Sequence, residues 1–362
     1  MDKALLIGSF TYVGFFFIFC IIAQFVEVSI KKRQLSYLFL IANLAFCIIA
    51  YYSTDNSDGW DLNRYYIEID RLRKHNFSYA LRYGHYKETV LANLLFYLIS
   101  RTNNNYLLQV CAVFISFGIL SYIIVDLKFK KTHRLSTVLL YFLMLFGIIS
   151  FSTLLLGVRW ILSLSIAALA AYKEEKKPFN IISVALYVIS MMIHNGILLL
   201  IIVRLISIFK FKWIKLIVVF FMLILPYFEN FFAKFSYLSY AYSKLMTYSS
   251  SDLGDLRVFV VKICYLICFV CIAFFQRKDK RLKSCITNYQ YNYLAAIIGS
   301  INVSNLMERS LGVYYLAFSD SIVDALENRN FQIIKYVLMF LSIGMYMYQF
   351  VFFKTFWRFR IL

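Results

Sequence analysis

The sequence predicts an all-α integral membrane protein that crosses the bilayer many times. Of its 362 residues, 62% are hydrophobic and 16% are charged, and only 2 are proline, which excludes a disordered or loop-rich chain. One bilayer crossing needs roughly 20 apolar residues. Charge-free stretches of about that length recur between 4–26 and 284–307, and a single soluble core would not need so many of them.

The distribution of charge predicts the topology. Lys and Arg outnumber Asp and Glu by 38 to 19, an excess that would also suit a nucleic-acid-binding protein. These basic residues, however, gather between the apolar stretches, as they do in the cytoplasmic loops of membrane proteins. Their clusters lie at 31–33, 128–134, 173–177, 210–215 and 277–283. We therefore expect the N-terminus outside, the C-terminus in the cytoplasm, and the bilayer rather than nucleic acid as a partner.

The stretches between the basic clusters predict a single polytopic domain over 1–362 with about eleven (about 10 to 12) transmembrane helices. In chain order they are expected at 4–26, 35–52, 105–125, 135–152, 153–172, 179–194, 195–209, 213–232, 257–275, 288–306 and 331–353. The stretch 179–209 is long for one helix and short for two. A broken or re-entrant helix is therefore expected there, of the kind that lines a cavity.

Two long connections, 53–104 and 233–256, are expected on the extracytoplasmic side. Acidic residues gather in and near them, so we expect any chemistry to face outward. Within the first loop, 90–99 is apolar but too short to cross a bilayer. It predicts a short interfacial helix.

Three ionisable side chains lie where they are costly: Arg159, His194 and Arg309. A charge inside a transmembrane helix costs at least about 2.5–3.5 kcal/mol on insertion scales, so such a residue is expected to have a function. Arg159 follows Gly157, whose missing side chain could leave room for a ligand. The alternatives are an Arg159 that extends to the interface or pairs with a carboxylate, a His194 satisfied in the core, and a local ion pair between Arg309 and Glu308.

The first outer loop contains an acidic cluster, Asp55, Asp58 and Asp61, with Tyr65 close behind. Asp58 and Asp61 are three residues apart and would share one face of a helix. Such a pair could act as a general base, bind sugar hydroxyls or hold a divalent cation, whereas the plain alternative is a solvated charge run. We expect no metal or other cofactor to be resident.

The motifs that the sequence lacks narrow the choice of substrate. The sequence contains no phosphate-binding P-loop, no dinucleotide fingerprint and no common hydrolase motif, so energy must come from the substrate or from a gradient. A lipid-linked sugar pyrophosphate presented at the outer leaflet would supply it. Its polyprenyl tail needs a groove in the bilayer, its pyrophosphate needs Arg, and its glycosyl acceptor needs a carboxylate or His.

Four short motifs, taken in this order and topology, resemble those of the EpsG-like branch of the Wzy-type polysaccharide polymerases, which make capsule, exopolysaccharide and O-antigen. They are Asp58-Gly59-Trp60-Asp61 with Tyr65, then Gly157-Val158-Arg159, then His194, then Glu308-Arg309 with Tyr314-Tyr315. The resemblance covers roughly 35–320. Each motif is short, so its specificity comes from the succession.

The resemblance implies a bacterial glycosyltransferase at the outer face of the cytoplasmic membrane. It would move a growing glycan from its undecaprenyl pyrophosphate carrier onto the next lipid-linked repeat unit, in some systems beside a chain-length regulator. Asp58 or Asp61 would contact or deprotonate the acceptor, with His194 beside the leaving group. The substrate contacts would be Arg159 and Arg309, which bind the pyrophosphate, together with Tyr65, Glu88, Glu308 and Tyr315.

Two other functions fit parts of the pattern. A flippase or transporter of lipid-linked oligosaccharide would also need outer acids and an intramembrane Arg, but it should carry charges along a path through the bilayer and show repeat symmetry. A membrane acyltransferase that modifies surface sugars would use a histidine such as His194, but it leaves the acids of the first loop unexplained.

Overall fold

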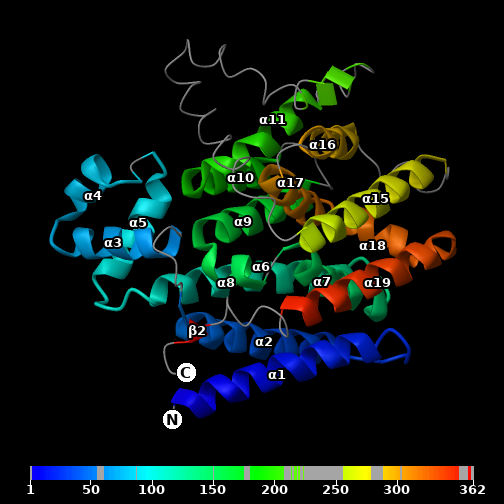
Figure 1. Ribbon diagram of the computed structural model, residues 1–362, viewed down its shortest axis with the longest axis horizontal. Helices are drawn as coiled ribbons and strands as arrows, with labels where there is room; N and C mark the ends of the chain where they lie inside the picture. The colour runs from blue at the N-terminus through cyan, green and yellow to red at the C-terminus, as the bar shows by residue number, and fades with distance from the viewer. Residues whose placement is uncertain are drawn as a thin grey trace. The chain divides into compact units, whose positions relative to one another are not determined.

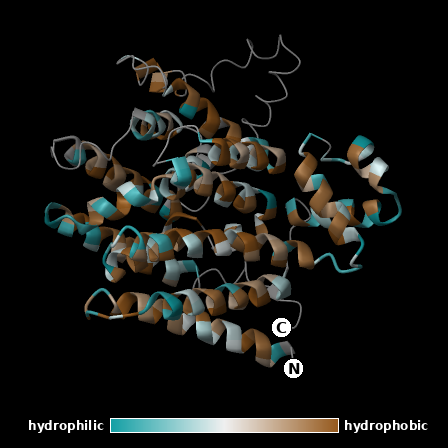
Figure 2. Ribbon diagram, turned by 180° about the vertical axis from the view of Figure 1, so that it is seen from behind, coloured by the Kyte–Doolittle hydropathy of each residue, from teal (hydrophilic) through white to brown (hydrophobic). Residues whose placement is uncertain are grey.

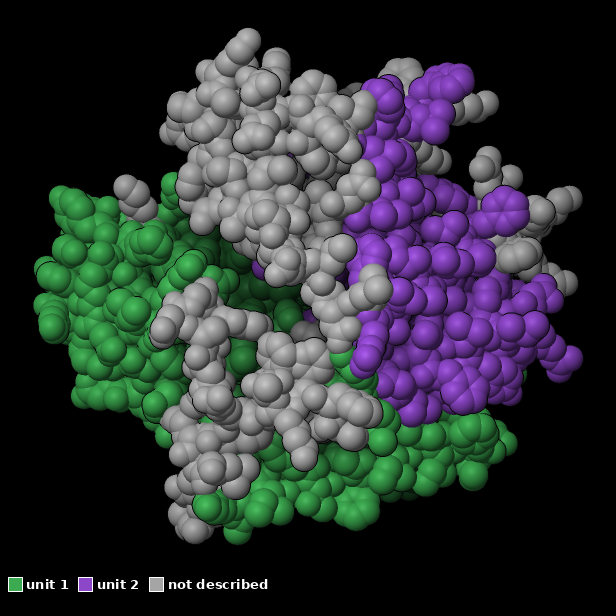
Figure 3. Space-filling model, in the orientation of Figure 1, with its two compact units in different colours: residues 1–146, 150–198, 346–362 green, residues 147–149, 199–345 purple. Residues whose placement is uncertain are grey.

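The computed structural model describes most of the chain and is almost entirely helical (Figure 1), as the sequence predicts. The described residues are 2–54, 61–86, 88–149, 151–174, 180–207, 213, 216–217, 219–220, 223, 256–278, 288–301, 304–349 and 358–359. Within them, two-residue strands β1 (Ser53–Thr54) and β2 (Arg358–Phe359) pair antiparallel. The chain divides into two compact units, coloured in Figure 3: unit 1 (1–146, 150–198 and 346–362) and unit 2 (147–149 and 199–345).

Unit 1 contains the helices of the first half of the chain. They are α1 (Asp2–Ile22), α2 (Lys32–Tyr52), α3 (Asp61–Arg73), α4 (Phe77–Tyr83), α5 (Val90–Ser100), α6 (Leu107–Phe129), α7 (Leu135–Ile148, whose last residues count with unit 2), α8 (Phe151–Leu156), α9 (Val158–Glu174), α10 (Ile181–Ile193) and the 3-10 turn η1 (Asn195–Ile197). The described part of unit 2 contains α11 (Leu198–Ile206), α15 (Leu256–Lys278), α16 (Asn288–Gly299), α17 (Ser304–Ala317), α18 (Ser319–Glu327), the turn η3 (Arg329–Phe331) and α19 (Gln332–Met347, whose last residues count with unit 1).

The long helices of unit 1 form a row in which α1 packs on α2, α2 on α6, α6 on α9 and α9 on α10 (Figure 1). Small residues let α9 approach its neighbours closely, as is usual between membrane helices. They include the buried Ala167 and Ala171. Ser163 and Ser190 lock α9 to α10, since each hydroxyl donates to the other residue's carbonyl, at 2.8 and 2.7 Å. The centre of the row is therefore both tightly packed and internally hydrogen-bonded.

Neighbouring helices in this row run in opposite directions, except that α6 and α9 run parallel, with their last turns joined by the hydrogen bond from Tyr172 to Asp126. The basic clusters at 31–33 and 128–134 and the end of α9 at Glu174 lie at one end. The first loop folds into α3, α4 and α5 at the other end, where α5 packs on α3, α4 and α10 (Figure 1). A short helix is present where 90–99 predicted one, as α5, while its interfacial position and the sidedness of the connections stay predictions.

Five helices among the described residues are long and apolar enough to cross a membrane, which indicates a membrane protein. They lie at Lys3–Ile22, Lys32–Tyr52, Leu107–Phe129, Arg257–Phe274 and Arg329–Met347. Figure 2 colours the ribbon by hydropathy, and hydrophobic positions predominate along the helices. The full set of about eleven is not confirmed. The predicted helix 213–232 and the loop 233–256 lie almost entirely outside the described residues.

Several predicted spans are shorter than expected because the backbone is interrupted. In place of 135–172 the structure has α7, α8 and α9, and α7 with 14 residues is only about 21 Å long, less than the roughly 30 Å hydrocarbon core. In place of 288–306 it has the whole of the short helix α16 and the first residues of α17. The break predicted within 179–209 falls at His194, which is extended at φ −152° and ψ 119°.

Candidate functional site

Arg159 joins three helices of unit 1. It is the second residue of α9, and its Nε donates to the carbonyl oxygen of Ile193, the last residue of α10, at 3.2 Å. Its Nη2 donates to the hydroxyl of Thr89, the N-cap residue of α5, at 2.9 Å. Thr89 is buried and does not cap its own helix, because its hydroxyl donates to Tyr86 instead. The guanidinium is thus held between the end of one helix and the start of another.

Two tyrosine rings lie over the same guanidinium. The Cζ atom of Arg159 is 4.3 Å from the ring centroid of Tyr86 and 5.8 Å from that of Tyr65, both within the roughly 6 Å range of cation–π contacts. Tyr65 is itself buried and packs on Phe96 and Tyr86. Within the described part of the chain, no carboxylate forms an ion pair with Arg159. Its described partners are all neutral.

The structure explains the glycine at position 157 differently from the sequence analysis. A Cβ atom at this position would lie 2.6 Å from the carbonyl oxygen of Thr153, one turn earlier. Gly157 therefore permits the close backbone approach between α8 and α9, and the expectation that it leaves room for a ligand is not needed to explain it. By keeping this junction tight, it places Arg159 at the start of α9.

His194 lies at the same end of α9 and α10 as Arg159. Its Nδ1 accepts a hydrogen bond from the backbone N–H of Gly196 at 2.9 Å, so a neutral ring carries its proton on Nε2. Its ring meets the indole of Trp160 edge-on, with centroids 5.4 Å apart. A Cβ atom on Gly196 would lie 2.8 Å from Nδ1, so a larger residue here would push the His194 ring out of this position.

The three acids of the first loop that the sequence named as site residues are placed differently. Asp58 lies outside the described residues. Asp61 begins α3 with 58% of its side chain exposed and lies 3.9 Å from Arg64, a loose surface pair. Glu88 is exposed and directly precedes the Thr89 that contacts Arg159. Asp61 and Glu88 therefore remain accessible near the arginine.

Tyr65 is neutral at physiological pH. Burial raises the pKa of its phenol above the usual range, the Asp61 carboxylate acts in the same direction, and the Arg159 cation acts against them. Burial likewise raises the pKa of Tyr86, against the lowering effect of Arg159. Both side chains therefore present a neutral ring and hydroxyl to the arginine, and not a phenolate that would neutralise it.

The other candidates from the sequence lie in unit 2. Glu308 on α17 forms an ion pair with Lys262 of α15, its Oε1 3.0 Å from Nζ. Lys262 is 1% exposed and also donates to the carbonyl of Ile148. Arg309 is half-buried, and Tyr315 is fully buried in the core of unit 2. Glu308 thus pairs with Lys262, which is far from it in the sequence, in addition to any contact with the adjacent Arg309.

Sequence reasoning missed Tyr86, Thr89, Trp160 and Lys262. Tyr86 and Thr89 flank the predicted Glu88, but nothing in an ordinary Tyr or Thr signals a contact with a residue about 70 positions away. Lys262 did carry a signal, because it is the one charge in the apolar stretch 258–275.

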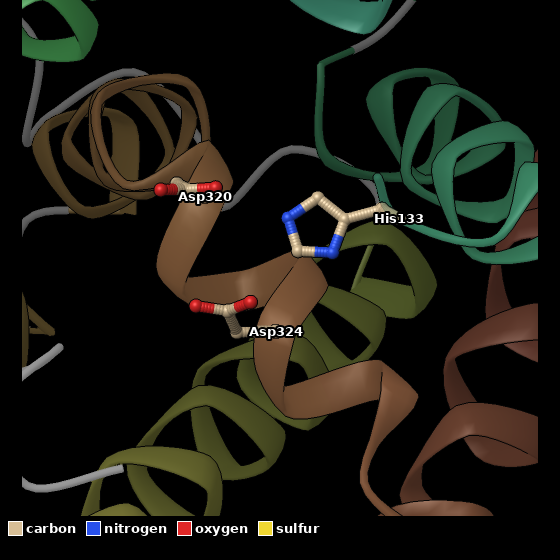
Figure 4. Close-up of side chains that lie close together, drawn as sticks. All are labelled: His133, Asp320 and Asp324. Atoms are coloured by element: carbon tan, nitrogen blue, oxygen red, sulfur yellow. The ribbon is translucent and has the colours of Figure 1, made fainter. Parts of the chain in front are cut away.

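Asp320 and Asp324 lie one turn apart on α18 and turn their carboxylates toward the same side (Figure 4). Figure 4 also draws His133, which follows α6 and belongs to unit 1, whereas the two acids belong to unit 2. We therefore assign no metal site to these three side chains. The expectation that no metal is resident stays a prediction.

Comparison of the chain with protein-family models, with curated proteins and with solved structures finds no match. The resemblance to Wzy-type polymerases therefore depends on the order of the motifs, and the chemistry of the site has to be argued from its residues.

Proposed function

We propose that this chain is a bacterial polysaccharide polymerase, a glycosyltransferase that joins oligosaccharide units carried on undecaprenyl pyrophosphate. The observation that carries the proposal is Arg159, a half-buried cation at the end of a helix whose described partners are all neutral. A guanidinium held in this way keeps its full charge for an anionic ligand. Its planar fork matches phosphate oxygens better than an ammonium would.

The surroundings of Arg159 favour an anion further. The start of α5 lies at Thr89, so the partial positive charge of that helix terminus adds to the guanidinium. Two positive groups side by side, with no described carboxylate in an ion pair with the guanidinium, repel each other and are stabilised when an anion binds. A pyrophosphate that gains negative charge as its bond to sugar breaks would gain most from this arrangement.

Asp61 supplies the second function that the reaction needs. It is exposed, lies one turn before Tyr65 on α3, and is free to accept a proton from an acceptor hydroxyl, with Asp58 as the alternative base. The hydroxyl oxygen would attack the anomeric carbon, the bond from that carbon to the pyrophosphate would break, and the proton would pass to the carboxylate. One such displacement inverts the anomeric configuration, whereas a covalent intermediate would retain it.

The proposal includes a topology. The site lies at the end of unit 1 opposite the basic clusters at 31–33 and 128–134, and the positive-inside rule puts that end outside the cytoplasm. It also includes about eleven spans, an outer N-terminus and a cytoplasmic C-terminus. A cysteine introduced at Asp70 should react with an impermeant reagent in intact cells, and one at Lys130 only after permeabilisation. The reverse pattern would remove Asp61 from the reaction.

The resemblance, rather than the geometry, adds Arg309 as a second ligand of the pyrophosphate and His194 as a neighbour of the leaving group. In the tautomer indicated by its bond to Gly196, His194 would donate from Nε2 to a phosphate oxygen instead of acting as a base at Nδ1.

The test is complementation in the host. The gene is inactivated, and the cells receive the wild-type chain, Arg159→Ala, or the control Arg33→Ala, whose guanidinium also lies over a ring, that of Tyr37, but at the opposite end of unit 1. Surface polysaccharide is then resolved on a gel, and membrane levels of each variant are measured by an epitope tag. We expect wild type and Arg33→Ala to restore the ladder and Arg159→Ala to leave single repeat units on lipid.

Two other results would point to the alternative functions. Repeat units that accumulate on the cytoplasmic face of the membrane would identify a flippase. A polymer of normal length that lacks a substituent would identify an acyltransferase. Either result would overturn the polymerase proposal.

A further inference from the structure

Unit 1 contains a cavity of about 530 Å³ at the end opposite α3–α5, in the size range of roughly 300–1,000 Å³ typical of small-molecule sites. It is lined by 23–28, which follow α1, and by Lys128, Arg134, Leu135 and Ser136 at the end of α6 and the start of α7. None of these residues belongs to the candidate site around Arg159. The basic clusters at this end mark it as the end of the helices that meets the cytoplasmic headgroups.

The lining carries charges of both signs. Lys128 and Arg134 are cationic, and Lys128 donates to the neutral carbonyl of His133 at 3.0 Å. Glu27 is exposed and, among the residues that the structure describes, forms no ion pair. The cavity can therefore offer donors to an anionic group and a carboxylate to a cationic one.

Gln24 contributes to the cavity wall a side-chain oxygen that has no hydrogen-bond donor among the described residues. Its Nε2 donates to the carbonyls of Cys20, at 3.0 Å, and Ser136, at 2.8 Å, and these two bonds fix the orientation of the amide. Its Oε1 is buried and accepts no hydrogen bond from the described residues. Buried polar atoms are normally paired, so this oxygen needs a donor, and an N–H group in the cavity would satisfy it after a small shift of the Gln24 side chain.

Apolar side chains lie beside these polar groups. Phe25 is 68% exposed and Val26 is 56% exposed, and both line the cavity. Large exposed apolar residues next to a charged cavity at the end of membrane helices fit a ligand that is polar at one end and has hydrocarbon chains at the other.

We infer that this cavity binds the headgroup of an ethanolamine phospholipid. The phosphate would accept from Lys128 and Arg134, the ammonium would donate to Glu27 and to Oε1 of Gln24, and the acyl chains would run along Phe25 and Val26. A purely anionic headgroup would leave Glu27 and Gln24 unsatisfied. A choline headgroup has no N–H to donate.

The inference is tested by native mass spectrometry of the full chain purified in detergent. The protein is offered phosphatidylethanolamine, phosphatidylcholine or phosphatidylglycerol with identical acyl chains. We expect the ethanolamine lipid to bind about tenfold or more tightly than the choline lipid, the difference expected for loss of charge-assisted hydrogen bonds. Equal retention of the two lipids would overturn the inference, as would displacement of the lipid by inorganic phosphate alone.

Variants locate the site. Glu27→Gln changes an exposed side chain and should abolish the preference for ethanolamine over glycerol headgroups, whereas Lys128→Gln should weaken both. The control is Lys173→Gln, at the same end of unit 1, whose ammonium lies 4.6 Å from the ring of Tyr122 and does not line the cavity. A preference that survives in Glu27→Gln, or that disappears in Lys173→Gln, would refute this location. The readout is binding, so it is independent of the polymerase proposal.

Discussion

Replacement of Arg159 by Met separates a role in substrate binding from a role in folding. Met keeps much of the length and apolar stem of Arg but removes the guanidinium. It thereby removes the hydrogen bonds to Ile193 and Thr89 and both cation–π contacts. Arg159→Lys is the companion variant, since it keeps the charge and loses the planar fork.

The effect on stability is expected to be small. Each lost hydrogen bond from a charged donor is worth about 1.5–3 kcal/mol, but removal of a half-buried guanidinium with neutral partners also relieves a desolvation cost of several kcal/mol. These terms oppose each other, so we expect a net change within about 2 kcal/mol. The effect on catalysis has no such compensation, because loss of one preorganised donor to developing negative charge costs about 10²–10³ in kcat.

The assay uses proteoliposomes supplied with lipid-linked repeat units extracted from a strain that lacks the polymerase. Initial rates of chain extension are compared with thermal unfolding of the same preparations, with Arg33→Met as the control for an exposed arginine over a tyrosine ring. We expect at least about a hundredfold loss of rate in Arg159→Met with little change in melting temperature, and an intermediate loss in Arg159→Lys. A rate within about threefold of wild type, or a loss matched by unfolding, would refute the assigned role.

Three further predictions concern particular contacts. Gly196→Ala places a methyl group 2.8 Å from Nδ1 of His194, so chain extension should fall about tenfold or more at an unchanged level of folded protein; unchanged rates would remove His194 from the site. Lys262→Met leaves Glu308 without its partner and should lower the unfolding free energy by about 1–3 kcal/mol, a moderate loss because Glu308 is partly solvated. Adding Glu308→Gln to this variant should restore part of the lost stability, as measured by thermal unfolding. The raised pKa of Tyr65 means that the folded state holds the phenolic proton more tightly than the unfolded state, whose value is near 10.0. Its contribution to stability is therefore complete below that pH and lost as the pH rises toward the folded pKa, so Tyr65→Phe should show a smaller fall in melting temperature between pH 8 and pH 11 than wild type.

The candidate site residues in the first half of the chain could be found from the sequence because each departs from the pattern of the residues around it. Arg159 is a charge in an apolar stretch, and His194 stands at a break in another. The structure brings them to one end of α9 and α10, and adds Tyr65 through its ring contact with Arg159. The role of Asp58 stays a prediction, since it lies outside the described residues.

The partners of these residues could not be found in the same way. Thr89 contacts Arg159 only because α5 returns from the first loop to pack on α10, and Lys262 contacts Glu308 only because α15 packs on α17. Nothing in the composition of either helix specifies which neighbour it selects. The reason for Gly157 is likewise a distance between backbone atoms rather than a property of its surroundings in the sequence.

The sequence by itself determined the helical class and the membrane setting, because hydropathy acts through sums over neighbouring residues. Only the tertiary structure decided where helices break, that α5 packs on α10, and which neutral groups surround Arg159. Those features depend on distances between residues far apart in the chain, and packing of side chains, not local preference, sets such distances.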